Sequence, residues 1–105
     1  MIITTTGQIE GKKTLKVLGL VHANSVRAKS IGKDILAGFR SIAGGEIPEY
    51  TQLMAESRDL AITRLKERAA SQGANAILEL RFVTAAVMQN AAEILAYGTA
   101  VVLEE

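Results

Sequence analysis

Residues 48 to 72 carry the longest amphipathic pattern in the chain, and the apolar sector of that pattern is unusually wide. Its apolar positions are Tyr50, Leu53, Met54, Leu60, Ala61, Ile62, Leu65 and Ala69. On a helix these positions span roughly 200°, whereas a helix that covers one sheet needs little more than about 100°. We therefore expect this helix to pack against its own sheet and also against a second helix or a neighbouring subunit.

The ends of this helix are marked by residues with special backbone properties. Pro48 suits a first turn because its φ is fixed and it has no N–H to leave unpaired. Glu46 and Glu49 place negative charge near the positive end of the helix dipole. Gly73 follows Gln72 and predicts the end of the helix there.

A shorter helix is predicted between Ser30 and Gly44. Ser30 is a suitable N-cap, and the apolar residues that follow it at helical spacing are Ile31, Ile35, Leu36, Phe39, Ile42 and Ala43. Gly44 predicts a left-handed C-terminal position, which glycine occupies without strain. We interpret Gly44–Gly45 as a joint between two helices.

Neither this glycine pair nor the two Gly-Lys pairs have the pattern of a phosphate-binding loop. Gly44–Gly45 follows a helix, and no Lys-Ser or Lys-Thr comes after it. The pairs Gly11–Lys12 and Gly32–Lys33 lack the upstream glycine of a P-loop, since Thr6 and Arg27 stand in its place. A nucleotide-binding loop is therefore not predicted.

Four stretches outside the helices predict β-strands. They are the β-branched residues 2–6, the apolar run 15–21, the segment 75–84 and the segment 93–103. The continuous apolarity of the second stretch favours burial on both faces of a sheet. Residues 22–28 predict either a weak strand or an extended loop, and residues 85–92 predict a connection.

The segment 75–84 alternates with period two. Leu78, Leu80 and Phe82 are expected on one face of the sheet, and Glu79 and Arg81 on the other. Strands on both sides of a helical block, closed by a hairpin-like pair, predict an α+β fold with a mostly antiparallel sheet.

The composition indicates one domain with more aliphatic surface than a small monomer usually buries. The chain has 105 residues, of which 49% are hydrophobic, with only two Phe and two Tyr among them. Surplus aliphatic surface in a small chain is often covered in a subunit interface. We therefore expect the partner of this chain to be another copy of itself, in a homo-oligomer.

Charge and targeting features argue against several other partners. The net charge is +1, and the 12 Lys and Arg are interspersed with 11 Asp and Glu, so no cationic face for nucleic acid is predicted. The apolar runs fall short of the roughly 20 residues that cross a bilayer. The first residues lack a basic leader followed by an apolar core. We expect a cytoplasmic location and no membrane partner.

No residue pattern predicts catalysis or a metal site, and no cofactor is expected. The sequence has no cysteine and a single histidine, His22, so the usual thiolate and imidazole metal ligands are missing. Its eleven acidic residues are scattered, and it has no Gly-x-Ser-x-Gly. Arg58, Arg64 and Arg68 border the apolar sector of the long helix. Their charged ends are expected to reach water, to form an intersubunit ion pair, or to line an anion pocket between subunits.

Several segments together resemble the YbjQ family of small bacterial and archaeal proteins, which is labelled as heavy-metal-binding. In chain order they include "TTT", "IEGK", "AGFRSIAGGE", "GANAI" and "YGTAVV". The resemblance covers nearly the whole chain and implies a single domain over residues 1–105. It also implies a two-layer α+β subunit similar to dodecin, with a β-α-β-β core, assembled into a ring-like homopentamer.

The sequence departs from the family pattern on the strand after "GANA". Arg81 and Val83 stand where many members carry acidic residues, and Glu79 stands where glycine is common. This departure argues against a carboxylate metal site in this chain.

The leading hypothesis is a non-enzymatic, homo-oligomeric domain, pentameric by resemblance, that binds a small ligand, an anion or a metal between subunits. Two alternatives remain open: an enzyme with its active site built across the interface, and a heavy-metal-binding stress protein. An enzyme should bring several polar groups together in one cleft, whereas a scaffold should present an apolar interface.

Overall fold

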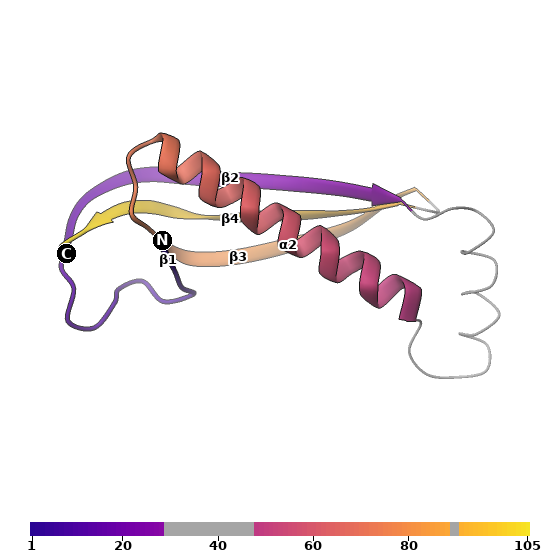
Figure 1. The fold of residues 1–105 in the computed structure, drawn as a ribbon, viewed down its shortest axis with the longest axis horizontal. Helices are drawn as coiled ribbons and strands as arrows, with labels where there is room; N and C mark the ends of the chain where they lie inside the picture. The colour runs from indigo at the N-terminus through magenta and orange to yellow at the C-terminus, as the bar shows by residue number, and fades with distance from the viewer. Residues whose placement is uncertain (29–47, 89–90) are drawn as a thin grey trace.

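A computed structural model describes residues 1–28, 48–88 and 91–105, which form a helix packed on one face of a four-stranded sheet (Figure 1). The elements are β1 (Ile2–Ile3), β2 (Thr14–Ala28), α2 (Pro48–Ser71), β3 (Ala76–Met88) and β4 (Ala91–Leu103). The strand order is β1-β3-β4-β2. β1 runs parallel to β3, and β4 pairs antiparallel with both β2 and β3. The fold is therefore α+β with a mixed, mostly antiparallel sheet.

The sheet is built from long strands, and the helix covers only part of it. β2 has 15 residues, and β3 and β4 have 13 each, whereas a typical strand has about 5–6. The helix packs mainly on β2 and β4 and barely touches β3. As a result the side chain of Phe82, which points to the helix side of β3, is 40% exposed.

The helix begins and ends as the sequence predicts. It runs from Pro48 to Ser71, and Gly73 has a φ of 92°, in the left-handed region that glycine occupies freely. Its buried stripe consists of Leu53, Ser57, Ala61, Leu65 and Ala69. Other members of the predicted apolar sector, namely Tyr50, Met54, Leu60 and Ile62, are only half-buried. The part of the chain that the structure describes therefore leaves the sector incompletely covered.

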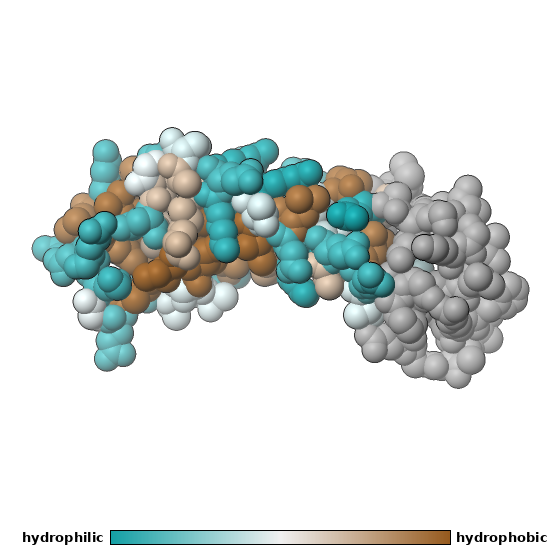
Figure 2. Space-filling view, in the orientation of Figure 1, coloured by the Kyte–Doolittle hydropathy of each residue, from teal (hydrophilic) through white to brown (hydrophobic). Residues whose placement is uncertain are grey.

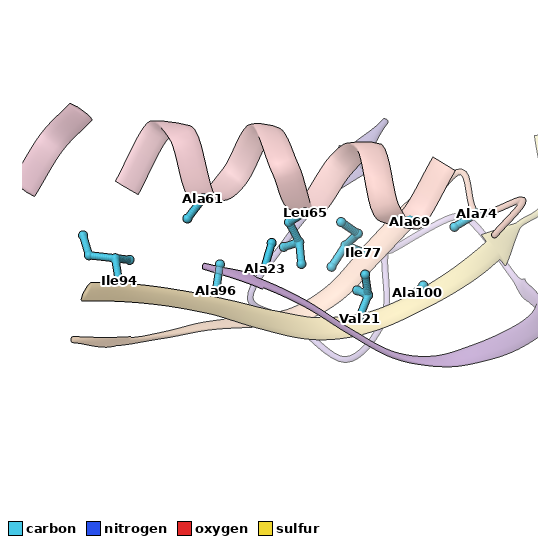
Figure 3. Close-up of a cluster of buried hydrophobic side chains, with 10 residues drawn as sticks. All are labelled: Val21, Ala23, Ala61, Leu65, Ala69, Ala74, Ile77, Ile94, Ala96 and Ala100. Atoms are coloured by element: carbon cyan, nitrogen blue, oxygen red, sulfur yellow. The ribbon is translucent and has the colours of Figure 1, made fainter. Parts of the chain in front are cut away.

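Small side chains let the helix approach the sheet closely. Ala61, Leu65 and Ala69 of α2 point down toward the sheet, where Ala23 lies on β2 and Ala96 and Ala100 lie on β4 (Figure 3). A second cluster, Ala76, Leu78, Val101 and Leu103, lies on the opposite face and packs against Ile9. The segment before β2 thus covers one end of the face that the helix does not reach.

The predicted burial of residues 15–21 on both faces is wrong for the single chain. β2 is an edge strand, and Leu15, Val17 and Leu20 are 60%, 63% and 69% exposed. Residues 22–28, which could have been a strand or a loop, continue the strand. Along it Val21, Ala23 and Ser25 are buried beneath the helix and their neighbours are exposed.

The predicted common face for Leu78, Leu80 and Phe82 is also wrong. A β-bulge interrupts β3 at Glu79, which has a φ of 54°. Leu78 joins the cluster on the face away from the helix, whereas Leu80 packs on the helix side. The bulge inserts one extra residue into β3. The side chains after it therefore point to the faces opposite to those that period-two alternation predicts.

Three further expectations concern segment boundaries. Of the predicted connection 85–92, residues 85–88 belong to β3 and residues 91–92 to β4, and Met88 pairs with Ala91. The first strand is shorter than predicted and comprises only Ile2–Ile3. The predicted helix from Ser30 to Gly44, with the Gly44–Gly45 joint, lies outside the described residues.

Candidate functional site

The face of the sheet that the helix does not cover, called here the open face, carries a mixture of polar and apolar side chains. Residues directly opposite each other in an antiparallel ladder share a face. The register aligns His22 with Tyr97 and Arg81, and the next row is Asn24 with Leu95 and Val83. Leu20 and Thr99 continue the open face toward one end, where Val17 and Val101 follow, and Val26, Glu93 and Ala85 lie at the other end.

One end of the open face is hollowed. A depression of about 320 Å³ is lined by Leu20, Glu79, Arg81, Tyr97, Gly98 and Thr99. Arg81 is held in place because its Nη1 donates to the carbonyl oxygens of Thr5 and Leu80, at 3.1 and 2.8 Å. The depression therefore brings a carboxylate, a guanidinium and a phenol to one shallow surface, which can bind a small polar molecule.

The groups in this depression are not arranged as a catalytic pair. Within the described ranges, no hydrogen bond joins the carboxylate of Glu79 to the hydroxyl of Tyr97 or Thr99. A nucleophile needs a base within hydrogen-bonding reach to be activated. The arrangement supports binding and does not indicate acid–base or nucleophilic chemistry.

His22 lies in the middle of β2, with its side chain exposed on the open face. Tyr97 of β4 lies directly opposite it in the sheet. Among the residues that the structure describes, no group of three or more His, Cys, Asp or Glu side chains could hold a metal ion. His22 is therefore not brought together with other ligands in this part of the chain.

The three arginines of the helix have two different roles. Arg64 donates from Nη1 to the carbonyl oxygen of Asn24 at 2.8 Å, and Arg68 donates to that of His22 at 2.7 Å. Arg58 instead lines an apolar hollow of about 260 Å³ with Met54, Phe82, Thr84 and Ile94. Two of the three side chains are thus committed to the chain's own edge strand, which the sequence analysis did not anticipate.

Other polar contacts tie the helix to β2. The Arg27 guanidinium lies 3.3 Å from the Glu56 carboxylate, and both side chains are more than one-third exposed, at 41% and 46%. Ser25 donates from Oγ to the carbonyl oxygen of Ser57 at 2.7 Å in the buried layer between helix and strand. On the open face Asn24 Nδ2 donates to Glu93 Oε2 at 3.0 Å. The first two contacts fix the helix on the strand, and the third joins β2 to β4 on the open face.

The glycine-lysine pairs do not form a site. Gly11 has a φ of 80° and lies in the turn before β2, where Ile9 and Lys12 form an isolated bridge. Gly32–Lys33 and Gly44–Gly45 lie outside the described residues. Among the described helical residues, none forms a stretch both long and apolar enough to cross a membrane.

The family to which the chain belongs follows from comparison with known proteins. The YbjQ_1 family model, described as "Putative heavy-metal-binding", matches residues 1–104. The chain belongs to this family. The predicted resemblance is confirmed, and the heavy-metal-binding description belongs to the family model.

Relatives from several organisms cover nearly the whole chain. A UPF0145 protein of Dehalococcoides mccartyi is 60% identical over 104 residues, covering 99% of this chain and 100% of the relative. A UPF0145 protein of Vibrio parahaemolyticus is 50% identical over 105 residues, covering 100% of both. One from Thermus thermophilus is 49% identical over 104 residues, covering 99% of this chain and 91% of the relative. Their names assign no activity.

A solved structure supports the fold. The crystal structure of a protein of unknown function from Pediococcus pentosaceus, assigned to the DUF74 family, matches with a TM-score of 0.66. The two sequences are 20% identical, and the match covers 99% of this chain and 98% of the other. At this identity the likeness concerns the fold alone.

Proposed function

We propose that this YbjQ-family chain is a non-enzymatic subunit of a homo-oligomeric ring that holds a small ligand between its copies. The observation that supports the proposal is the exposed apolar surface of the sheet. The large side chains concerned are Leu15, Val17, Leu20, Phe82 and Val83, each between 40% and 69% exposed. Apolar side chains at this density on one small chain indicate a surface that another molecule covers.

The distribution of this surface favours other copies of the same chain as the cover. In the view of Figure 2, hydrophobic surface (brown) remains visible between hydrophilic side chains (teal) along the described body. The half-buried helix residues Tyr50, Met54, Leu60 and Ile62 add to it. A closed ring repeats the same contacts around an axis and covers such surface on every subunit.

The subunit that we propose is dodecin-like, with β2-α2-β3-β4 as its β-α-β-β core in two layers. Five is the number of subunits that the family resemblance implies. The depression at Glu79, Arg81 and Tyr97 is the place where a small polar or anionic ligand would bind between copies. The near-neutral net charge of +1 argues against a nucleic-acid partner.

Sedimentation equilibrium tests the assembly. We expect a single oligomeric species at micromolar concentration, and a monodisperse monomer would overturn the proposal. Leu60→Glu places a charge in the half-buried flank of the helix and should dissociate the oligomer. Thr63→Glu, at an exposed position on the same helix, is the matched control and should leave it intact.

The description of the family supplies a second candidate, a heavy-metal-binding protein. Calorimetry with zinc, copper and nickel on untagged protein tests it. We expect weak binding or none, because one histidine and dispersed carboxylates cannot enclose such an ion. Stoichiometric submicromolar binding that survives His22→Ala would establish an oxygen-ligand site and favour the metal-binding candidate.

A further inference from the structure

The two edges of the sheet differ in how their backbone groups are satisfied. On the β2 edge, the carbonyl oxygens of His22 and Asn24 accept hydrogen bonds from Arg68 and Arg64 of the helix. A strand that approached this part of β2 would have to displace both guanidinium groups. The middle of β2 is therefore closed to strand addition.

The β3 edge is closed over its first part only. Thr4 donates to the carbonyl oxygen of Ile77 at 3.0 Å, and Leu80 donates to that of Thr4 at 2.9 Å. The Glu79 N–H donates to the carbonyl oxygen of Thr6 at 3.0 Å. From Arg81 to Met88, β3 has no strand beside it on this edge within the described residues.

The uncovered part of β3 has the composition of a strand that pairs. Its sequence, RFVTAAVM, has no charged residue after Arg81. Proteins usually protect a solvent-exposed edge with charges, proline or a covering element, because unpaired backbone groups recruit other strands. The side chains from Arg81 to Ala85 are exposed on both faces. Within the described residues the stretch has no such protection, which favours pairing with another strand.

The same chain offers a second apolar edge, on a strand that β-bulges interrupt between Thr14 and Lys16 and between Val17 and Gly19. The first half of β2, residues 14–20, lies at the other sheet edge, before the stretch that the arginines occupy. Leu15, Val17 and Leu20 are exposed there, and Lys16 is its only charge. This half of β2 is as apolar as the open part of β3, and no described strand pairs with it at the other edge of the sheet.

We propose that the open part of β3, residues 81–88, pairs with residues 14–20 of β2 in a second copy of this chain. The inference rests on the proposed ring and names the joint between its subunits. Because the two surfaces differ, the contact is heterologous and can repeat around a ring. A single isologous contact would end at a dimer. Pairing β3 with β3 about a two-fold axis would leave Leu15, Val17 and Leu20 exposed.

The strand directions are compatible with this joint. β2 and β3 both run antiparallel to β4, so they run in the same direction within one chain. Copies related by rotation about an axis roughly along the strands would meet as parallel strands and continue one sheet around the ring. Each chain would then use both of its open edges, and the exposed apolar residues along the two edges would be covered.

Cross-linking tests the joint directly, because the chain has no cysteine of its own. Val17 and Val83 both lie on the open face, opposite Val101 and Leu95 of β4. With a short bismaleimide, the double variant Val17→Cys/Val83→Cys should form a ladder of covalent multimers that ends at the ring size. Each single variant should remain uncross-linked. Val26→Cys/Val83→Cys, which joins two similarly exposed open-face positions, is the matched control and should give no ladder.

A charge test provides a second readout. Val83→Lys should shift the sedimentation profile to monomer, whereas Val26→Lys, at a residue of similar exposure (56% against 49%), should leave the oligomer intact. An intact oligomer without the ladder, or dimers from Val83→Cys alone, would overturn the joint and leave the proposed oligomer standing. A wild-type monomer would overturn both.

Discussion

The guanidinium of Arg68 donates a hydrogen bond of 2.7 Å to the backbone carbonyl oxygen of His22, in the middle of edge strand β2. Arg64, one helical turn earlier, makes the same contact with Asn24, two residues further along the strand. Four residues of helix rise about 6 Å and two residues of strand rise about 6.6 Å, so the spacings match. The helix therefore acts on this edge in place of a partner strand.

Removing these two side chains should destabilise the chain and expose the edge. We expect Arg64→Met/Arg68→Met to lower the free energy of unfolding by about 1–2 kcal/mol, since charge-assisted hydrogen bonds to backbone are lost at a partly exposed site. Urea unfolding at fixed protein concentration measures the change. Arg58→Met is the control, because Arg58 makes no hydrogen bond within the described residues. Equal stability of the double variant and the control would contradict the capping role.

The buried serines should respond to alanine in opposite directions. Ser25 Oγ donates to the Ser57 carbonyl at 2.7 Å, whereas Ser57 Oγ is buried with no hydrogen-bond partner among the described residues. Ser25→Ala should lower the free energy of unfolding by about 1 kcal/mol, because a buried carbonyl loses its donor. Ser57→Ala should raise it by about 0.5 kcal/mol, because an unpaired hydroxyl is removed and alanine favours the helix. Thermal unfolding of both variants measures the sign of each change in stability. If both variants lose stability by similar amounts, Ser57 Oγ must have a hydrogen-bond partner.

Gly98 should not tolerate a side chain. A β-carbon there would lie 2.9 Å from both Ile77 Cγ2 and the Leu78 carbonyl oxygen, beside the β3 bulge. Since backbone atoms of an inner strand cannot move freely, Gly98→Ala should cost about 1–3 kcal/mol. Thr99→Ala, at the adjacent half-buried position, should cost less than about 1 kcal/mol. Urea midpoints compare the two, and equal midpoints would mean that the bulge shifts to make room.

The features that the sequence predicts well are those that depend on local pattern. Pro48, Gly73 and the helical spacing between them give the bounds of α2 within one residue at each end. β4 is likewise predicted from its β-branched residues, and it starts only two residues earlier than expected. Family membership follows from several short segments read together.

The features that the sequence misses depend on which elements become neighbours. The apolar run 15–21 has the same pattern whether its faces are covered within one chain or by another copy, so its edge position was not predictable. The bonds of Arg64 and Arg68 exist because α2 lies along β2, which no residue spacing reveals. For the candidate site, the bulge that shapes the depression occurs at a glutamate, a residue that rarely marks a left-handed position.

Glu79 should be replaceable by glycine with a gain in stability. Its φ of 54° lies in the left-handed region. A residue with a β-carbon is less stable there than glycine by about 1 kcal/mol. Its backbone is held there by the N–H bond to the Thr6 carbonyl at 3.0 Å, so the bulge should persist in the variant. Glu79→Gly should therefore raise the free energy of unfolding by about 1 kcal/mol.

Glu79→Ala separates this backbone effect from the effect of the carboxylate. The Glu79 Oε1 lies beside Gly7, 3.4 Å from where a β-carbon would stand, so the side chain itself makes a contact that both variants lose. If backbone strain dominates, glycine should be more stable than alanine by about 1 kcal/mol, and alanine should not exceed the wild type. Urea unfolding at one protein concentration, with the slope of the transition unchanged, provides the comparison. A glycine variant less stable than the wild type would mean that the carboxylate contact outweighs the strain at this bulge.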